Sequence, residues 1–234
     1  MTLKLVDLAK QYAAIGRDVD DAVRRVVRSG VFIGGGEVAS FEREWASFCE
    51  CRHAVGVANG TDALELVLRA LDLPAGFEVL TVANTFVATV EAIVNAGGKP
   101  VFCDVTPDTL LLDPDELSRK LTPSTRVVMP VHLYGAPADM GRISAFARLH
   151  ALHVIEDAAQ AHGVRCAGNP VGRASAAATF SFYPGKNLGA YGDAGAVVTD
   201  DDRLAARVRL LKDHGRTSKY LHESIGRNSR IDAL

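Results

Sequence analysis

Lys186 and Asp157 are the two residues whose chemistry stands out in this sequence. Lys186 lies in a glycine-containing turn between two apolar, strand-like runs, 176–182 and 194–199. A lysine held there is suited to form a Schiff base with a carbonyl cofactor, although taken alone it is more often a loop residue with a solvated charge. Asp157 follows the strand-like run 152–155. Acid and amine would then both lie at the carboxyl ends of neighbouring strands, where open α/β sheets bind ligands.

The elements that must hold these two residues alternate between strand and helix. Continuous apolar runs typical of buried strands occur at 53–57, 78–82, 100–103, 126–131 and 152–155. Amphipathic helices are predicted at 63–71, 87–96, 114–121 and 140–150, with two more, 19–27 and 38–48, around a glycine break near the N-terminus. Buried strands separated by helices of about ten residues predict an α/β fold with three α/β/α layers and a mostly parallel central sheet. Because no helix separates 176–182 from 194–199, part of the sheet should be antiparallel.

Residues 59–62, Asn-Gly-Thr-Asp, close one predicted strand and open a helix. Gly60 allows close approach of the backbone, and free amides at a helix N-terminus together with the Thr61 hydroxyl favour an anion. The alternative is that Thr61 or Asp62 merely caps the helix. Ser181, in the strand-like run that leads to Lys186, could supply a further hydroxyl to the same anion.

Three side chains could contact a flat heteroaromatic ring. Phe86 could stack on the face of the ring, although an isolated phenylalanine is more often a core residue. Asp157 could hold a proton on a ring nitrogen, and the Gln160 amide could bond a ring hydroxyl. Each signal is weak alone, but together with Lys186 and the anion site they predict a pyridoxal phosphate pocket.

Composition excludes several other classes of protein. A net charge of −2 over 234 residues gives no reason to expect nucleic acid or an anionic membrane, and no apolar run is long enough to span a bilayer. Acidic residues within the first 30 positions argue against a signal peptide. The four cysteines lack the spacing of a zinc site or a disulfide framework, so we expect no metal and a reducing, cytoplasmic setting.

Two other motifs allow different interpretations. Gly34-x-Gly36-x-x-Ala39 formally matches a dinucleotide fingerprint, but no acid ends a second strand about twenty residues further on. His132 and His162 could either border the cofactor pocket or be buried in the core.

Several strings, taken together, resemble the DegT/DnrJ/StrS sugar aminotransferases, which are pyridoxal-phosphate enzymes of fold type I. They include NGTDAL (59–64), IEDAAQAHG (155–163) and SFYPGKNLGAYGDAGAVVT (181–199), and the resemblance runs from about Leu5 to Leu234. It implies that Lys186 is the Schiff-base lysine and Asp157 the partner of the pyridine nitrogen. The implied contacts of the other residues are Gln160 at the phenolic oxygen, Phe86 on the ring, and Gly60, Thr61 and Ser181 at the phosphate.

The resemblance also implies a reaction and a partner. The expected enzyme transfers an amino group, with glutamate as donor, to a nucleotide-linked keto-deoxysugar in sugar, antibiotic or cell-surface glycan biosynthesis. Asn228 would reach the phosphate of the neighbouring subunit's cofactor, which implies a homodimer with shared active sites. Relatives that dehydrate the sugar replace the lysine with histidine, so Lys186 argues against that alternative.

The expected domain organisation follows from the same resemblance. Residues 1–234 would form the large, cofactor-binding domain, with an N-terminal helical segment over about residues 1–50. Family members continue into a smaller C-terminal domain that completes the substrate site, and we expect this domain to be missing here. A catalytically silent or regulatory dimerising fragment is the alternative. One departure, Ala194 in place of the usual glycine, puts a methyl group near the lysine turn.

Overall fold

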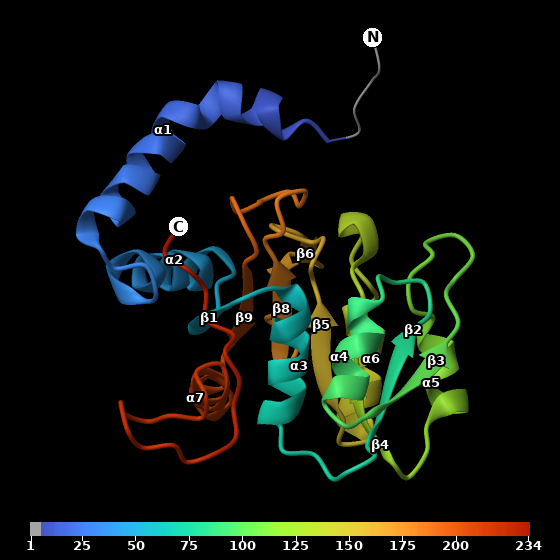
Figure 1. Cartoon of the computed structure of the whole chain (residues 1–234). Coiled ribbons are helices and arrows are strands. Elements are labelled where there is room, and N and C mark those ends of the chain that lie inside the picture. The colour runs from blue at the N-terminus through green and yellow to red at the C-terminus, as the bar shows by residue number, and fades with distance from the viewer. Residues whose placement is uncertain (1–5) are drawn as a thin grey trace.

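The computed structural model describes residues 6–234, which form a central sheet with helices on both faces (Figure 1). The helices are α1 Leu8–Ser29, α2 Gly35–Phe48, α3 Gly60–Ala70, α4 Ala88–Asn95, α5 Pro114–Lys120, α6 Met140–Leu149 and α7 Asp202–Leu211, with a short 3-10 turn at Leu133–Gly135. The strands are β1 His53–Val57, β2 Glu78–Val82, β3 Lys99–Cys103, β4 Thr125–Val128, β5 His153–Asp157, β6 Arg165–Cys166, β7 Asn169–Pro170, β8 Ala177–Ser181 and β9 Gly195–Thr199.

The main sheet has seven strands in the order β1-β9-β8-β5-β4-β2-β3. The pairs from β8 through β5, β4 and β2 to β3 are parallel, whereas β9 runs antiparallel to both of its neighbours, β1 and β8. This arrangement confirms the predicted α/β fold and its antiparallel part. It also places the ends of β1, β2, β5 and β8 at the same edge of the sheet as the start of β9.

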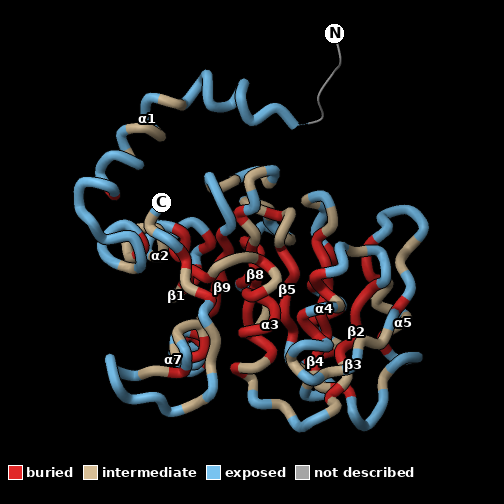
Figure 2. The backbone as a smooth tube through the Cα atoms, viewed as in Figure 1, coloured by how far each residue is buried: buried red, intermediate tan, exposed pale blue. Residues whose placement is uncertain are grey.

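Alternation along the strands divides the core between the two faces of the sheet. Val55 and Ile155 pack with α3, α4 and α7 on one face. Their chain neighbours Ala54 and Val154 face the other side, in clusters that include α2 or α5 and α6. Because successive side chains of a strand point to opposite faces, each strand contributes to both cores. Figure 2 shows the resulting buried band along the strands. The α/β/α layering is therefore as predicted.

One predicted strand is shorter than expected. The apolar run 126–131 forms β4 only as far as Val128. Pro130 has no amide hydrogen to continue the ladder, although its carbonyl still accepts from Asp157 N–H at 2.9 Å, and Val131 makes an isolated bridge to Asp157. The chain therefore leaves the sheet beside the end of β5, where it contributes to the cavity described below.

The N-terminal helix is longer than predicted. Helix α1 begins at Leu8 rather than near residue 19, because Leu8, Tyr12 and Ile15 continue the apolar spacing and the Asp7 side chain caps Lys10 N–H at 3.1 Å. Only Val26 of α1 is buried within residues 6–234, and the helix extends away from the sheet (Figures 1 and 2). The first five residues of the predicted helical segment lie outside the described part of the chain.

Two elements were not predicted from the sequence. Helix α7 is capped by Asp201, which accepts from the N–H groups of Arg203 and Leu204, and it buries Leu204, Ala205, Val208 and Leu211 at helical spacing. The short hairpin of β6 and β7 follows the site loop after β5. Its strands are two residues each, too short to produce an alternating pattern.

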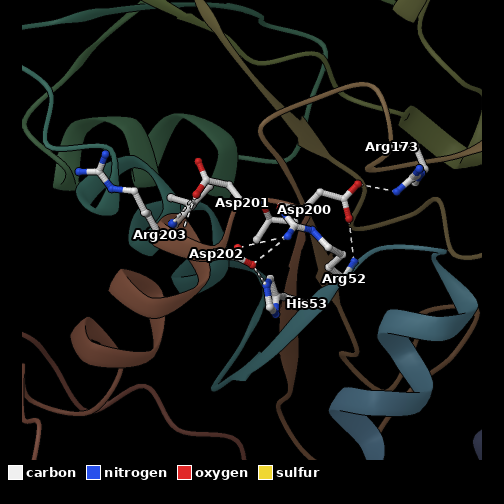
Figure 3. A network of polar contacts seen from close by, with 9 residues as sticks. Arg52, His53, Arg173, Asp200, Asp201, Asp202 and Arg203 are labelled. Atoms are coloured by element: carbon white, nitrogen blue, oxygen red, sulfur yellow. Dashed lines mark hydrogen bonds and ion pairs between the residues drawn. The ribbon is translucent and has the colours of Figure 1, made fainter.

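The amino ends of the parallel strands carry a surface ion network (Figure 3). Asp200 accepts from Arg52 N–H at 2.7 Å and pairs with Arg173, while Asp202 contacts His53 Nε2 at 2.7 Å. The network ties the end of β9 to the start of β1 and to the loop before β8.

Among the helices that the structure describes, none is long and apolar enough to cross a membrane.

Candidate active site

A cavity of about 530 Å³ opens at the carboxyl ends of the parallel strands, within the size range of small-molecule sites. All the predicted site residues except Asn228 line it. Its lining residues are Asn59, Gly60, Thr61, Leu64, Thr85, Phe86, Ala88, Val131, His132, Leu133, Asp157, Ala159, Gln160, Ser181, Tyr183, Lys186 and Asp193. The topology brings together residues from both halves of the chain, because β1, β5 and β8 end at the same edge.

The N-terminus of α3 forms one end of the cavity. Asn59 caps the helix by accepting Asp62 N–H at 2.7 Å, so the suggestion that Thr61 or Asp62 is the cap was wrong. The cap uses one of the first amides of the helix and leaves those of Gly60 and Thr61 without a partner inside the helix. A Cβ on Gly60 would lie 2.7 Å from Ser181 Cβ, so glycine is needed for α3 and β8 to approach this closely. The result is a compact, amide-rich end suited to a phosphate.

Lys186 lies in the turn between β8 and β9, with its side chain half-buried at the cavity wall. Its backbone N–H donates to the Tyr183 carbonyl at 2.8 Å, which closes the turn. Burial lowers the pKa of the Lys186 amine below its ordinary value, and the Asp157 carboxylate opposes that shift. Lys186 thus places an amine of lowered pKa at the cavity wall, where a carbonyl group could react with it.

Asp157 is the last residue of β5 and is 6% exposed. Its Oδ2 accepts from Thr89 Oγ1 at 2.7 Å, and its Oδ1 accepts from Ala159 N–H at 3.2 Å. Thr89 is fully buried on the first turn of α4, and its hydroxyl also contacts Thr85 Oγ1 at 2.7 Å. Sequence analysis did not identify Thr89, because Thr85 precedes the predicted helix 87–96 and helical periodicity therefore does not pair the two hydroxyls.

Gln160 is oriented by the backbone of the turn at Leu133–Gly135. Its Oε1 accepts from Tyr134 N–H at 2.7 Å. Since a backbone amide can only donate, the oxygen of the side chain must face Tyr134, and the NH₂ group remains available to donate into the cavity. Tyr134 adopts a left-handed conformation with φ 53°, which is uncommon for a residue other than glycine and is found at functional turns.

The two histidines left open by the sequence have different positions. His132 lines the cavity and is fully buried; its Nδ1 accepts from Ala138 N–H at 3.0 Å, so its Nε2 carries the proton donated to Glu156 at 2.8 Å. Glu156, which sequence analysis passed over although it adjoins Asp157, is also buried. His162 instead packs against Trp45 and aromatic neighbours in the core, and burial lowers its pKa.

The remaining predicted residues differ in how they relate to the cavity. Phe86 lines it and is 67% exposed, so one face of its ring is free to meet a ligand or a partner. Asn228 is exposed, does not line this cavity, and accepts from Arg230 Nε at 3.2 Å. The methyl group of Ala194 packs into the core with Phe182 rather than into the cavity. The departure at Ala194 therefore leaves the site unobstructed.

Comparison with known proteins identifies one family of aminotransferases. The model of the DegT/DnrJ/EryC1/StrS aminotransferase family matches residues 13–234. Over 229 residues the chain is 47% identical to the dTDP-3-amino-3,4,6-trideoxy-alpha-D-glucose transaminase of Streptomyces venezuelae, covering 98% of this chain and 60% of that protein. The chain spans less than two thirds of the length of the curated relatives it matches.

Solved structures are similar over almost the whole chain. The crystal structure of S. venezuelae DesV in complex with a ketimine intermediate has a TM-score of 0.97 at 46% identity, covering 99% of this chain and 62% of that one. The structure of NtdA from Bacillus subtilis with bound cofactor PMP has a TM-score of 0.89 at 35% identity, covering 93% of this chain and 50% of that one.

Proposed function

Because the chain belongs to the DegT/DnrJ/EryC1/StrS aminotransferase family, we propose that it carries the catalytic site of an enzyme that aminates a nucleotide-linked keto-deoxysugar. The observation that carries this proposal is the position of Lys186 and Asp157 on one cavity at the carboxyl edge of the sheet. Glutamate is the proposed amino donor.

Pyridoxal phosphate, on which this family depends, fits the residues present. When bound, it supplies an electron sink for the negative charge that develops at the α-carbon of the amino donor. The close contact of Gly60 with Ser181, where a Cβ would be 2.7 Å from Ser181 Cβ, makes a cradle of backbone amides at the start of α3. We propose that Gly60, Thr61 and Ser181 hold the phosphate there.

Lys186 and Asp157 carry the chemical roles. Lys186 Nζ would hold the cofactor and, as a free amine, would move the proton at the α-carbon of the amino donor. Burial supports this role, since it lowers the pKa of the amine and so favours its neutral form. Asp157, buried and bonded on both oxygens, keeps a proton on the pyridine nitrogen.

Two further residues orient the ring. Phe86 stacks on one face of the ring with its free surface. Gln160 donates from its NH₂ group to the phenolic oxygen, a direction supported by the bond that Tyr134 N–H makes to its carbonyl. Together they restrict the cofactor to one orientation between α4 and the end of β5.

The assembly and setting belong to the same proposal. We propose that residues 1–234 act as the large domain, that a smaller domain outside them completes the substrate site, and that Asn228 reaches the cofactor phosphate of a second subunit in a homodimer. Asn228 is exposed and lies away from the cavity of its own chain, which supports a contact with the cofactor of a second subunit. The four thiols are unpaired, which supports a reducing cytoplasm.

Covalent loading followed by turnover tests the function. The chain is incubated with pyridoxal phosphate, reduced with borohydride and mapped by peptide mass analysis, and the adduct is expected on Lys186. Lys212 is an internal control, because it is also a buried lysine but is held by Glu42 and the Gly56 carbonyl. The loaded chain is then offered glutamate and a panel of dTDP- and UDP-linked keto-sugars. An adduct on Lys212, or no visible absorption band at saturating cofactor, would contradict the proposal.

A further inference from the structure

The first turn of α4 reaches the catalytic carboxylate from behind the cavity wall. Thr89 Oγ1 lies 2.7 Å from Asp157 Oδ2 and 2.7 Å from Thr85 Oγ1. Thr85 lines the cavity, whereas Thr89 is fully buried and lies between Thr85 and the carboxylate. The two hydroxyls and the carboxylate therefore form a continuous hydrogen-bonded row that connects α4 to the end of β5.

The proton positions in this row follow from the chemistry of its ends. An ionised carboxylate can only accept, so the single proton of the Thr89 hydroxyl points to Asp157. The Thr89 oxygen is then left to accept, and Thr85 must donate to it. The order is Thr85 to Thr89 to Asp157, with each donor making the next hydroxyl a better donor.

The row also restricts the carboxylate mechanically. With Oδ2 bonded to Thr89 and Oδ1 bonded to Ala159 N–H at 3.2 Å, the carboxyl plane of Asp157, which is 6% exposed, cannot turn without breaking one of these bonds. Hydrogen bonds donated to a carboxylate favour its charged form. Phe86 lies between the two threonines in the chain, so the ring and the hydroxyl row come from one short segment that leads into the first turn of α4.

We propose that Thr89, supported by Thr85, is a positioning residue that holds the Asp157 carboxylate charged and aimed at the ring nitrogen of the bound cofactor. This inference rests on the proposed function, because it assumes that Asp157 faces a pyridine nitrogen. Without the Thr89 hydroxyl, the proton shared by ring and carboxylate should move toward the carboxylate, and the ring would withdraw electrons less strongly.

The test compares three variants. Thr89→Val removes the hydroxyl at nearly constant volume, and Thr89→Ser retains it. Thr81→Val is the matched control, because Thr81 is also fully buried and its hydroxyl donates to the Met129 carbonyl at 2.9 Å, without contact to Asp157. Each protein is loaded with pyridoxal phosphate labelled with ¹⁵N in the ring, and the nitrogen resonance is followed against pH. Single-turnover conversion by glutamate is measured in parallel.

In Thr89→Val we expect the ¹⁵N resonance to move toward that of an unprotonated ring at each pH, because the carboxylate takes more of the shared proton, and the glutamate reaction to slow about 10- to 100-fold, the loss expected for one hydrogen bond to a charged group. Thr89→Ser should restore both, and Thr81→Val should change neither. A ¹⁵N profile of Thr89→Val equal to that of the wild type, or a serine variant as impaired as valine, would overturn the inference. A wild-type chain that takes up no cofactor at Lys186 would instead overturn the proposed function, and this inference with it.

Discussion

Lys186 and Asp157 affect each other through charge, in addition to the cofactor that we propose they share. Burial lowers the pKa of the Lys186 amine, and the negative charge of Asp157 raises it. The two effects on the Lys186 pKa oppose each other. Asp157, whose main proposed role is to bond the ring nitrogen, therefore also limits how far burial lowers the pKa of the amine. Substitution of Asp157 should therefore change two properties in opposite directions.

Asp157→Asn should let the apo chain react with pyridoxal phosphate at lower pH and yet transaminate poorly. Removing the carboxylate leaves burial unopposed, so the Lys186 pKa falls further and the neutral amine persists to lower pH. The glutamate half-reaction should fall by several orders of magnitude, because the ring nitrogen loses the charge that keeps it protonated.

The pH dependence of loading and the single-turnover rate check both effects. Asp193→Asn is the control, since Asp193 lines the same cavity but does not contribute to the Lys186 shift. A rate within about tenfold of the wild type, roughly 1.4 kcal/mol, would show that Asp157 does not have this role.

At the scale of elements, the site depends on how closely α3, β8 and β9 approach one another. A Cβ on Gly195, at the start of β9, would lie 2.4 Å from the Asn59 carbonyl group just before α3. The contacting atoms are backbone, so they cannot turn aside as a flexible side chain would. The end of the cavity at the N-terminus of α3 is thus held by contacts that leave no room for a side chain at position 195.

Gly195→Ala should lower the free energy of unfolding by about 1–3 kcal/mol and weaken cofactor binding, because α3 must move away from β9. Gly36→Ala is the control: Gly36 lies in the first turn of α2, and an added Cβ there meets nothing within 4 Å. That change should leave stability equal or slightly higher. Urea unfolding measures the stability, and equilibrium titration measures cofactor binding. Equal stability and equal binding in the two variants would show that the close contact at Gly195 does not hold the site together.

At the scale of the whole molecule, the segment after α7 folds back onto α3. Arg227 pairs with Asp62 at 3.1 Å and with Glu65 at 2.5 Å, and these acids are only 6% and 5% exposed. Two nearly buried carboxylates on α3 therefore pair with a residue far along the chain, and Arg69 of the same helix, at 3.5 Å from Glu65, is a second cation near them. Stability and cofactor binding should be linked through this contact.

Arg227→Ala should destabilise the chain by about 1–3 kcal/mol, less than for a fully buried pair because Arg227 is partly solvated. Arg207→Ala provides the comparison, since Arg207 contacts Asp72 at 3.7 Å on the surface and both side chains are exposed. We expect no measurable loss there. Thermal and urea unfolding of the two variants measure the loss of stability. Equal losses in Arg227→Ala and Arg207→Ala would show that the buried acids do not need Arg227.

Asn228→Ala tests the shared site. If Asn228 reaches the cofactor of a second subunit, the wild-type chain should sediment as a dimer, and the variant should release pyridoxal phosphate faster without losing the fold. Lys219→Ala, in the same segment and outside the cavity, is the control. A monomeric wild type that retains its cofactor as firmly as the variant does would remove Asn228 from the site.

The amino-acid sequence by itself determined the alternation of strands and helices, the antiparallel pair around Lys186, and the set of residues near one edge of the sheet. These follow from local properties: apolar periodicity, helix-start residues and glycine turns act over a few neighbouring positions. The ends of β1, β5 and β8, which run in the same direction, then lie at one edge of the sheet, which is why Gly60, Asp157 and Lys186 could be predicted to meet.

Tertiary structure alone decided which side chains touch across that edge. Thr89 and Asp157 are 68 residues apart, and Arg227 and Glu65 are 162 apart. Periodicity identifies α4 as a helix but does not say which of its faces meets β5, because that choice depends on packing against the whole sheet. Pro130 could be recognised in the sequence as a residue that weakens a strand, but only the tertiary structure shows that the chain leaves the sheet there beside Asp157. The hydrogen bonds that orient Asp157 and Gln160 come from such long-range packing.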